Sequence, residues 1–269
     1  MEYNKNNPLK LFEICAGYGS QALAMNRLKE MYPDFDYELV GWAEFDPEMP
    51  NVPLERQPAV IAHNALHPEA EDKNWGDITQ ITWSELPDFD LLTYSTPCQS
   101  VSQAGLQHGF AEGSGTRSSI IWNVRDCVKI KRPKYLMLEN VRAMVSKKYV
   151  GLFNLWQREL ENLGYVNFAQ VLNAKDFNVP QNRERIFLIS VRIDNDEDYP
   201  KYYFPKPVPL ELCLEDVLEI DVDEKYFLSD EMLARFCEKS LEEEGSAAES
   251  APSENDFDDD DFENFFVAQ

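Results

Sequence analysis

The stretch that decides the fold is LKLFEICAGYGSQALAMNRLKEM, residues 9–31. Residues 9–15 form a largely apolar run that is typical of a buried strand, and residues 20–31 carry apolar side chains at helical spacing. Between them, residues 17–22 follow the pattern G-x-G-x-x-A. Such a turn brings backbone close to a ligand at a helix N-terminus, although the same pattern also suits a merely tight turn.

The rest of the chain repeats this alternation of strand and helix. Apolar runs predict further strands at 37–43, 91–95, 135–140, 167–173 and 185–192, and helical periodicity predicts helices at 119–131 and 151–163. Residues between the second and third strands are expected to be less regular. Alternation over about 180 residues predicts an α/β fold with a doubly wound, mainly parallel sheet. Ligands of such sheets bind at the carboxyl ends of the strands.

Composition places the chain among globular proteins. It has 269 residues, of which 43% are hydrophobic and 12% aromatic. No apolar run is long enough to span a membrane, and the first residues lack the apolar core of a signal peptide. Five scattered cysteines without a C-x-x-C pair argue against a disulfide framework or a zinc site, and they favour a reducing cytoplasm. His63 and His67 are expected on a solvated helix end and not as metal ligands.

Charge is concentrated towards the end of the chain. The net charge is −24, and residues 238–269 hold twelve acidic residues and one lysine. Residues 1–237 also have a net negative charge, so any surface that binds nucleic acid must be a local basic patch. We expect a catalytic domain over 1–195, a connector over 196–237 and an acidic disordered tail over 238–269.

One cysteine stands where an apolar strand meets a glycine-rich loop. The tripeptide Pro97-Cys98-Gln99 follows the strand predicted at 91–95. A lone cysteine is more often a small buried hydrophobe than a nucleophile, because only accessible, activated thiols react. Cys98 is therefore a candidate nucleophile that needs support from other motifs.

Acidic side chains end other predicted strands. Glu44 lies where an acid would accept hydrogen bonds from ribose hydroxyls, and Asp77 with Ile78 could surround an adenine edge. Glu139 ends the apolar strand at 135–140 and suits proton donation. Each residue taken singly is explained as well by an ordinary surface carboxylate. Glu44 and Asp77 on one edge with the glycine turn favour a cofactor that contains a nucleoside.

Two arginines precede the last predicted strand. Arg183 and Arg185 are two residues apart on an extended segment, so their side chains are predicted to face the same side. They could together grip a phosphate and a carbonyl oxygen, or they could form a salt-bridged edge of the domain.

In this order, the motifs resemble those of the cytosine-C5 DNA methyltransferase family. The matching pieces are Phe12–Ser20, Glu44, Gly76-Asp77-Ile78, Pro97-Cys98-Gln99 with Ser102 and Gly105, Glu139-Asn140-Val141, and Gln181-x-Arg183-x-Arg185. Residues 172–181 also match, and the resemblance covers residues 9–230. Chance agreement of so many ordered pieces is very rare.

The resemblance implies a Rossmann-like fold that uses S-adenosylmethionine. Glu44 would bind the ribose, Asp77 would lie near the adenine, and Phe45 and Ile78 would sandwich the ring. The cofactor site as a whole would comprise Phe12, Cys15, Gly17, Gly19, Ser20, Glu44, Phe45, Asp77, Ile78 and Pro97.

The resemblance also implies a reaction on a cytosine flipped out of double-stranded DNA. Cys98 would add to C6 and turn C5 into the centre that accepts the methyl group. Glu139 would hold N3 and Arg185 the O2 edge, with Arg183 nearer the backbone or the thiolate. The remaining assignments are Asn140, which would position the cysteine loop, and Gln99 and Ser102, which would belong to the substrate loop.

The chain departs from the family pattern after residue 237. The family's variable target-recognition region, its Arg-rich motif and its final Gly-Asn motif are not found, and most sequence-specific base contacts come from such elements. The missing lobe could be a separate polypeptide, the chain could be an inactive relic, or the enzyme could act with little sequence preference. Restriction–modification or phage self-protection is the expected setting. The alternatives are a tRNA cytosine-C5 methyltransferase and a subunit without its own activity.

Overall fold

The computed structural model describes residues 2–97, 111–115, 117–194 and 199–235. The chain divides into two compact units, residues 1–210 and 211–269. All the candidate site residues belong to the first unit.

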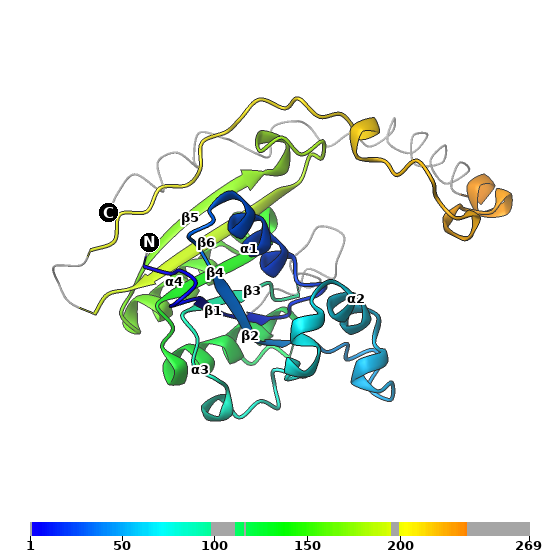
Figure 1. The fold of residues 1–269 in the computed structure, drawn as a ribbon. Coiled ribbons are helices and arrows are strands. Elements are labelled where there is room, and N and C mark those ends of the chain that lie inside the picture. The colour runs from blue at the N-terminus through cyan, green and yellow to red at the C-terminus, as the bar shows by residue number, and fades with distance from the viewer. Residues whose placement is uncertain (1, 98–110, 116, 195–198, 236–269) are drawn as a thin grey trace. The chain divides into compact units, whose positions relative to one another are not determined.

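The first unit is built on one six-stranded sheet (Figure 1). Its strands are β1 (Leu9–Ile14), β2 (Tyr37–Ala43), β3 (Leu91–Tyr94), β4 (Tyr135–Val141), β5 (Tyr165–Asn173) and β6 (Glu184–Arg192). They lie in the order β2-β1-β3-β4-β6-β5. The pairs β1–β2, β1–β3 and β3–β4 are parallel, whereas β6 is antiparallel to both of its neighbours. The predicted mainly parallel α/β sheet is therefore confirmed.

Helices cover both faces of this sheet. They are α1 (Ser20–Met31), α2 (Pro58–Leu66), α3 (Ile121–Lys131) and α4 (Val150–Asn162). The chain crosses from β1 to β2 in one direction and from β3 to β4 in the other, so right-handed crossovers place α1 and α3 on opposite faces (Figure 1). The edge-to-face contact of Trp122 with Trp156, 5.6 Å between ring centroids, shows that α3 and α4 pack together.

The stretch between β2 and β3 is more regular than the sequence predicts. It contains α2, which starts with Pro58 at its first position, and the 3-10 segments Leu54–Arg56, Pro68–Lys73 and Trp83–Glu85. Proline suits a helix start because its missing N–H would have no partner there. The expectation of irregular structure was wrong because α2 is short and lies among turns that obscure its periodicity.

Phe12 belongs to the core of the sheet. Its ring stacks on Phe89, with 5.1 Å between the centroids, and a Cβ on Gly41 would lie 2.6 Å from the same ring. Only glycine leaves room for the ring at that position of β2, next to the point where the register between β1 and β2 shifts. Phe12 therefore packs in the core of the sheet, and its assignment to the cofactor by the family resemblance stays a prediction.

The described part of the second unit, residues 211–235, has little regular structure. It contains the 3-10 turns Leu214–Val217 and Glu224–Tyr226. Residues 230–235 are helical. All residues from 211 to 235 except Val222 are exposed. No helix in the described ranges is long and apolar enough to cross a membrane.

Candidate active site

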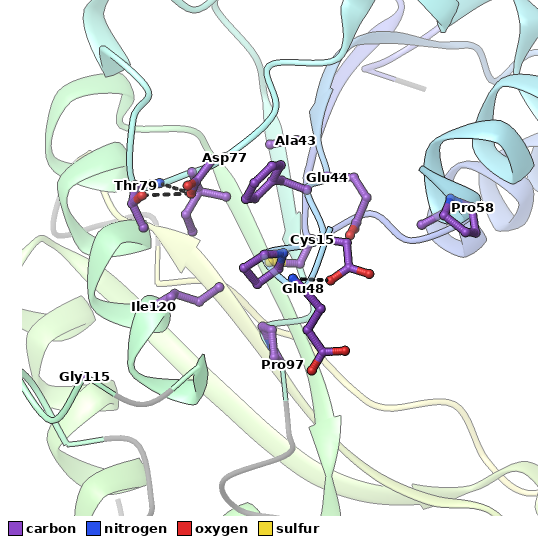
Figure 2. Close-up of a pocket in the computed structure, with 15 residues that line it drawn as sticks. Cys15, Ala43, Glu44, Glu48, Pro58, Asp77, Thr79, Pro97, Gly115 and Ile120 are labelled. Atoms are coloured by element: carbon purple, nitrogen blue, oxygen red, sulfur yellow. Dashed lines mark hydrogen bonds between the residues drawn. The ribbon is translucent and has the colours of Figure 1, made fainter. Parts of the chain in front are cut away.

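A cavity of about 580 Å³ lies where β1, β2 and β3 end (Figure 2). The chain leaves β1 and β3 in opposite directions across the sheet, and ligands of doubly wound folds bind at such a point. The lining residues are Cys15, Ala43, Glu44, Phe45, Asp46, Pro47, Glu48, Pro58, Ala59, Asp77, Ile78, Thr79, Pro97, Gly115 and Ile120. Six of them are residues that the family resemblance assigned to the cofactor. The volume is that of a small-molecule site.

The glycine turn between β1 and α1 reaches this cavity through Glu44. Gly17 and Gly19 have φ values of +57° and +78°, a left-handed backbone that favours glycine. The N–H of Gly17 donates a hydrogen bond of 2.7 Å to Oε2 of Glu44. Gly17, Gly19 and Ser20 are not part of the cavity lining itself. The glycine turn and Glu44, which follows β2, are therefore tied together by this hydrogen bond.

Asn74 holds Glu44 in place, and sequence reasoning missed it. Its Oδ1 accepts hydrogen bonds from the backbone N–H groups of Glu44 and Gly76, and its amide donates to the carbonyl of Glu44. The side chain thus ties the end of β2 to the segment that carries Asp77. Its place directly before the Trp75-Gly76-Asp77 turn was the only available signal, because this contact spans thirty residues.

The environment of Glu44 disfavours its charged form. Burial raises the pKa of the Glu44 carboxyl, and the backbone N–H groups of Gly17 and Phe45 partly oppose that rise. A carboxylate held in this way keeps acceptor capacity for hydroxyl groups inside the cavity.

Asp77 and Ile78 present a polar and an apolar surface side by side. Oδ1 of Asp77 accepts hydrogen bonds from the backbone N–H and the hydroxyl of Thr79, at 2.9 and 2.8 Å. Ile78 is buried, 5% exposed. Together with Phe45 they make a wall suited to a flat heteroaromatic ring that carries polar edges.

Cys15 lines the cavity as an unreactive thiol. Burial raises its pKa, and the nearby carboxylates of Glu44 and Asp77 raise it further. A thiol with such a pKa stays protonated at neutral pH and is a poor nucleophile.

A second group of candidate residues meets at the end of β4. Nε of Arg185 lies 3.1 Å from Oε1 of Glu139, and both side chains are 22% exposed. The pair joins two antiparallel strands, because Glu139 lies near the end of β4 and Arg185 near the start of β6. Both groups are fixed by the sheet and still reachable by a ligand.

Arg183 does not share this pairing. It lies before β6 begins, it is exposed, and its backbone N–H donates to Oδ1 of Asn173. The strand alternation on which the prediction of a common face rested therefore does not extend to Arg183.

Asn140 connects the two groups of residues. Its buried side-chain amide donates a hydrogen bond of 3.0 Å to the carbonyl of Thr96, and its Oδ1 accepts from the N–H of Val141. Thr96 precedes Pro97, which lines the cavity. Cys98, Gln99 and Ser102 lie outside the described residues.

Gln21 makes a further link that sequence reasoning missed. Its side-chain amide donates to the hydroxyl of Ser95, just after β3, and its Oε1 accepts from the hydroxyl of Ser20. The first turn of α1 is thereby joined to the segment that leads to Cys98.

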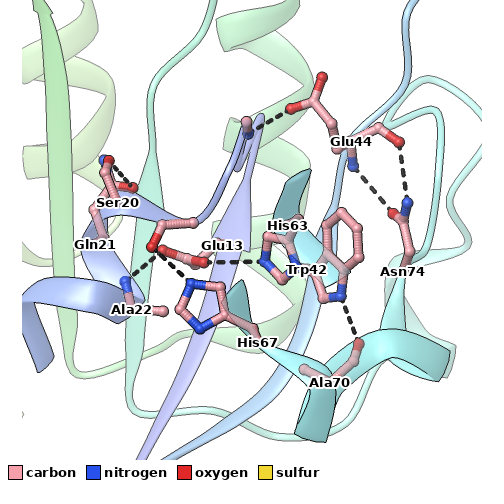
Figure 3. A network of polar contacts seen from close by, with 12 residues as sticks. Glu13, Ser20, Gln21, Ala22, Trp42, Glu44, His63, His67, Ala70 and Asn74 are labelled. Atoms are coloured by element: carbon pink, nitrogen blue, oxygen red, sulfur yellow. Dashed lines mark hydrogen bonds and ion pairs between the residues drawn. The ribbon is translucent and has the colours of Figure 1, made fainter. Parts of the chain in front are cut away.

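His63 and His67 are buried, so the expectation of a solvated helix end was wrong. Both side chains are 0% exposed and lie under the glycine turn with Glu13 (Figure 3). The ring of Trp42 stacks on that of His63. Burial of this face of α2 depends on contacts with β1 and β2, which lie outside the helix's own sequence.

The family model described as C-5 cytosine-specific DNA methylase matches residues 9–263. The chain is 37% identical over 267 residues to the type II methyltransferase M2.ScrFI of Lactococcus lactis subsp. cremoris, a match that covers 84% of this chain and 72% of that protein. It is 31% identical over 257 residues to the orphan methyltransferase M.Rho11sI of Bacillus phage rho11s, with 86% of this chain and 48% of that protein covered.

A solved structure of Spodoptera frugiperda DNMT2 is similar in fold. Its TM-score is 0.60 at 20% sequence identity, and the match covers 84% of this chain and 64% of that one. The chain thus spans between about half and three quarters of the length of these proteins.

Proposed function

The chain belongs to the C-5 cytosine-specific DNA methylase family, and from this premise we propose that it methylates C5 of cytosine in double-stranded DNA with S-adenosylmethionine. One observation carries the proposal. The hydrogen bond from Asn140 to the carbonyl of Thr96 joins the cavity wall at Pro97 to the strand end that holds Glu139. In the sequence Cys98 directly follows Pro97, which supports its proposed role as the nucleophile.

The cavity fits S-adenosylmethionine chemically. Glu44 offers carboxylate oxygens to ribose hydroxyls, and Phe45 and Ile78 offer apolar surface to an adenine ring. Asp77 would hold the polar edge of that ring. When bound, the cofactor supplies an electrophilic methyl group.

The residues of the chain would act on the cytosine as follows. A cytosine must leave the base stack before a protein side chain can reach C6. The Cys98 thiolate would add to C6, which moves electron density to C5. Glu139 would share a proton with N3, and Arg185 would hold O2 through its guanidinium donors. The 22% exposure of both side chains leaves room for this contact.

The proposed partner is a further protein segment that completes the DNA-binding face. Large apolar side chains are exposed through the second unit, among them Leu214 at 62%, Ile220 at 98% and Phe227 at 66%. Soluble proteins rarely leave a run of such side chains uncovered. The relatives are longer than the part that this chain matches, and the extra length would supply a cover for these residues. That segment, in the same or a separate polypeptide, would provide the base contacts that select a target sequence.

Methyl transfer from labelled cofactor tests the proposed reaction directly. The 269-residue chain would be offered mixed-sequence duplex DNA and bulk tRNA side by side, with cofactor binding measured in parallel. We expect cofactor binding and incorporation at C5 of DNA cytosine, weak and with little sequence preference in the chain alone because base-specific contacts are few. Incorporation into tRNA alone, or failure to bind the cofactor, would contradict the proposal. Strong, sequence-specific transfer by the chain alone would remove the need for a further segment.

Cofactor binding is expected to weaken as the pH is lowered through the raised pKa of Glu44. Protonation removes carboxylate acceptors for the ribose hydroxyls, and it occurs at a higher pH than for an ordinary glutamate because the side chain is buried. The folded state takes up this proton before the unfolded state does, so the contribution of Glu44 to stability increases as the pH falls. Loss of cofactor binding through protonation of Glu44 is therefore not caused by unfolding of the protein.

Calorimetric titrations of the cofactor across pH would measure this effect, with thermal unfolding recorded at each pH. Glu44→Gln should weaken binding about tenfold at neutral pH and flatten the pH dependence. Glu55→Gln, which changes an exposed glutamate that does not line the cavity, is the matched control and should leave both unchanged. An unaltered pH profile in Glu44→Gln would show that another group is responsible.

A further inference from the structure

A buried polar cluster lies directly beneath the glycine turn (Figure 3). It consists of Glu13 on β1, His63 on α2 and His67 at the end of α2, and their side chains are no more than 1% exposed. Burial of three ionisable side chains is costly unless their polar atoms find partners. The hydrogen bonds of His67 and Glu13 show which backbone groups this cluster holds.

His67 holds the carbonyl of Gly19. The distance from Nε2 to that oxygen is 3.0 Å, and a carbonyl can only accept, so Nε2 carries the hydrogen. The contact is close on all sides, because a Cβ on Gly19 would lie 2.5 Å from Nε2. The left-handed backbone of Gly19 is thus the conformation that lets the histidine approach from below.

Glu13 holds the other end of the same turn. Its Oε1 accepts a hydrogen bond of 3.0 Å from the N–H of Ala22, in the first turn of α1. An anion at this end of a helix is favoured by the helix dipole and by the unpaired N–H groups there. Three side chains therefore hold successive points of the turn. Glu44 accepts from Gly17, His67 donates to Gly19, and Glu13 accepts from Ala22.

His63 packs beside both Glu13 and His67. Its Nε2 lies 3.7 Å from Oε2 of Glu13, too far for a hydrogen bond, and its ring stacks on Trp42 with 3.5 Å between centroids and 11° between planes. The ring of His63 also lies 4.8 Å from that of His67. The stack presents a flat, rigid wall that limits the movement of both Glu13 and His67.

The cluster is not arranged as a metal site. Within the described ranges, no group of three His, Cys, Asp or Glu side chains could hold a metal ion. The remaining charged neighbour is Glu69, whose Oε1 lies 3.7 Å from Nδ1 of His67 and whose side chain is 57% exposed. The hydrogen bonds that Glu13 and His67 make go to the glycine turn and to the first turn of α1.

We propose that His67 and Glu13, backed by His63, are positioning residues that pre-form the glycine turn for S-adenosylmethionine. This inference rests on the proposed function. A turn with two left-handed glycines has many other conformations available, and ordering it at the moment of binding would reduce affinity. Anchors beneath the turn remove that cost in advance. Neither His67 nor Glu13 is among the described residues that line the cavity, so their loss should weaken cofactor binding and spare the rate at saturating cofactor.

Two substitutions of His67 separate positioning from simple packing. His67→Leu keeps the bulk and removes the donor, whereas His67→Gln keeps an amide N–H that reaches about as far as Nε2. We expect the dissociation constant for the cofactor to rise about tenfold in His67→Leu and to stay near the wild-type value in His67→Gln. Val60→Ala removes buried volume from the same helix without removing a hydrogen bond to the turn, and it is the matched control for stability.

Hydrogen exchange in the cofactor-free protein gives a readout that does not depend on activity. Peptides that cover residues 16–24 should exchange faster in His67→Leu than in wild type, and at wild-type rates in His67→Gln and Val60→Ala. If His67→Leu does not fold, His67→Asn makes the same comparison, because its amide is one methylene shorter and cannot reach Gly19.

Equal cofactor affinity in wild type, His67→Leu and His67→Gln would overturn the inference. Affinity losses that simply follow loss of stability, in Val60→Ala as much as in His67→Leu, would overturn it too. A wild-type protein that does not bind S-adenosylmethionine would contradict the proposed function instead, so the two failures are distinguishable.

Discussion

Cys98→Ala is expected to abolish methyl transfer and to leave cofactor binding intact. Without a nucleophile at C6, C5 of cytosine has no means of gaining the electron density that it needs to accept a methyl group. Removal of a nucleophile in a covalent mechanism costs on the order of 10⁴-fold in rate or more. Glu44, Phe45 and Ile78, which are proposed to hold the cofactor, are unchanged in this variant, so the affinity for the cofactor should change little.

The other thiols of the chain provide the controls for this substitution. Burial raises the pKa of Cys127 to about 12, and burial also raises the pKa of Cys15, so neither supplies a thiolate at neutral pH. Cys213 is exposed and belongs to the second unit, which makes Cys213→Ala the matched control. That variant should keep wild-type activity.

A covalent adduct gives a second measurement of the same role. Duplex DNA with 5-fluorocytosine at the target should remain attached to the protein, because fluorine at C5 cannot leave as a cation. We expect a band that resists denaturation in wild type and none in Cys98→Ala. Transfer or adduct formation that survives in Cys98→Ala would mean that the nucleophile has been assigned wrongly.

Glu139→Gln should reduce the rate at saturating substrates by about 10²- to 10⁴-fold, the range that general acid–base catalysis supplies. Glutamine has nearly the same shape but cannot share a proton with N3 of cytosine. It also leaves the guanidinium of Arg185, 3.1 Å from Oε1 of Glu139, without its charged partner.

Glu184→Gln is the matched control for the change at Glu139. Glu184 begins the neighbouring strand β6 and pairs with Arg142 at 2.9 Å, so it is also a glutamate bound to an arginine at this end of the sheet. Its 41% exposed side chain makes an ion pair of small energetic value. Single-turnover rates with pre-bound DNA would compare the two variants. An equally small loss of rate in both variants would mean that Glu139 is only an ion-pair partner of Arg185 and does not share a proton with the base.

Much of the framework was predictable because its signals are local. The apolar runs that predicted six strands are confirmed, as are the helices at 20–31, 119–131 and 151–163 to within two residues. Period and composition over ten residues are sufficient for such elements. Glu44 and Pro97 could be placed near one another because parallel strands all end at one edge of the sheet, whereas Asp77 follows no strand and was placed there by the family resemblance.

The supporting contacts of the site were not predictable in this way. Asn74 holds Glu44 across thirty residues, Gln21 reaches Ser95 across 74, and His67 reaches Gly19 across 48. Each partner sits in a local sequence that would suit an exposed polar residue equally well. The burial of His63 and His67 was missed for the same reason, because the buried face of α2 exists only against β1 and β2.

The sequence by itself determined the alternation of strands and helices, the position of the glycine turn and the family to which the chain is similar, because these follow from short-range periodicity and ordered motifs. Only the tertiary structure decided that Phe12 packs in the core, that Glu139 pairs with Arg185, and that two histidines lie under the glycine turn. The physical reason is that burial and pairing depend on which distant segment arrives opposite a residue. That choice is made by the packing of the whole sheet.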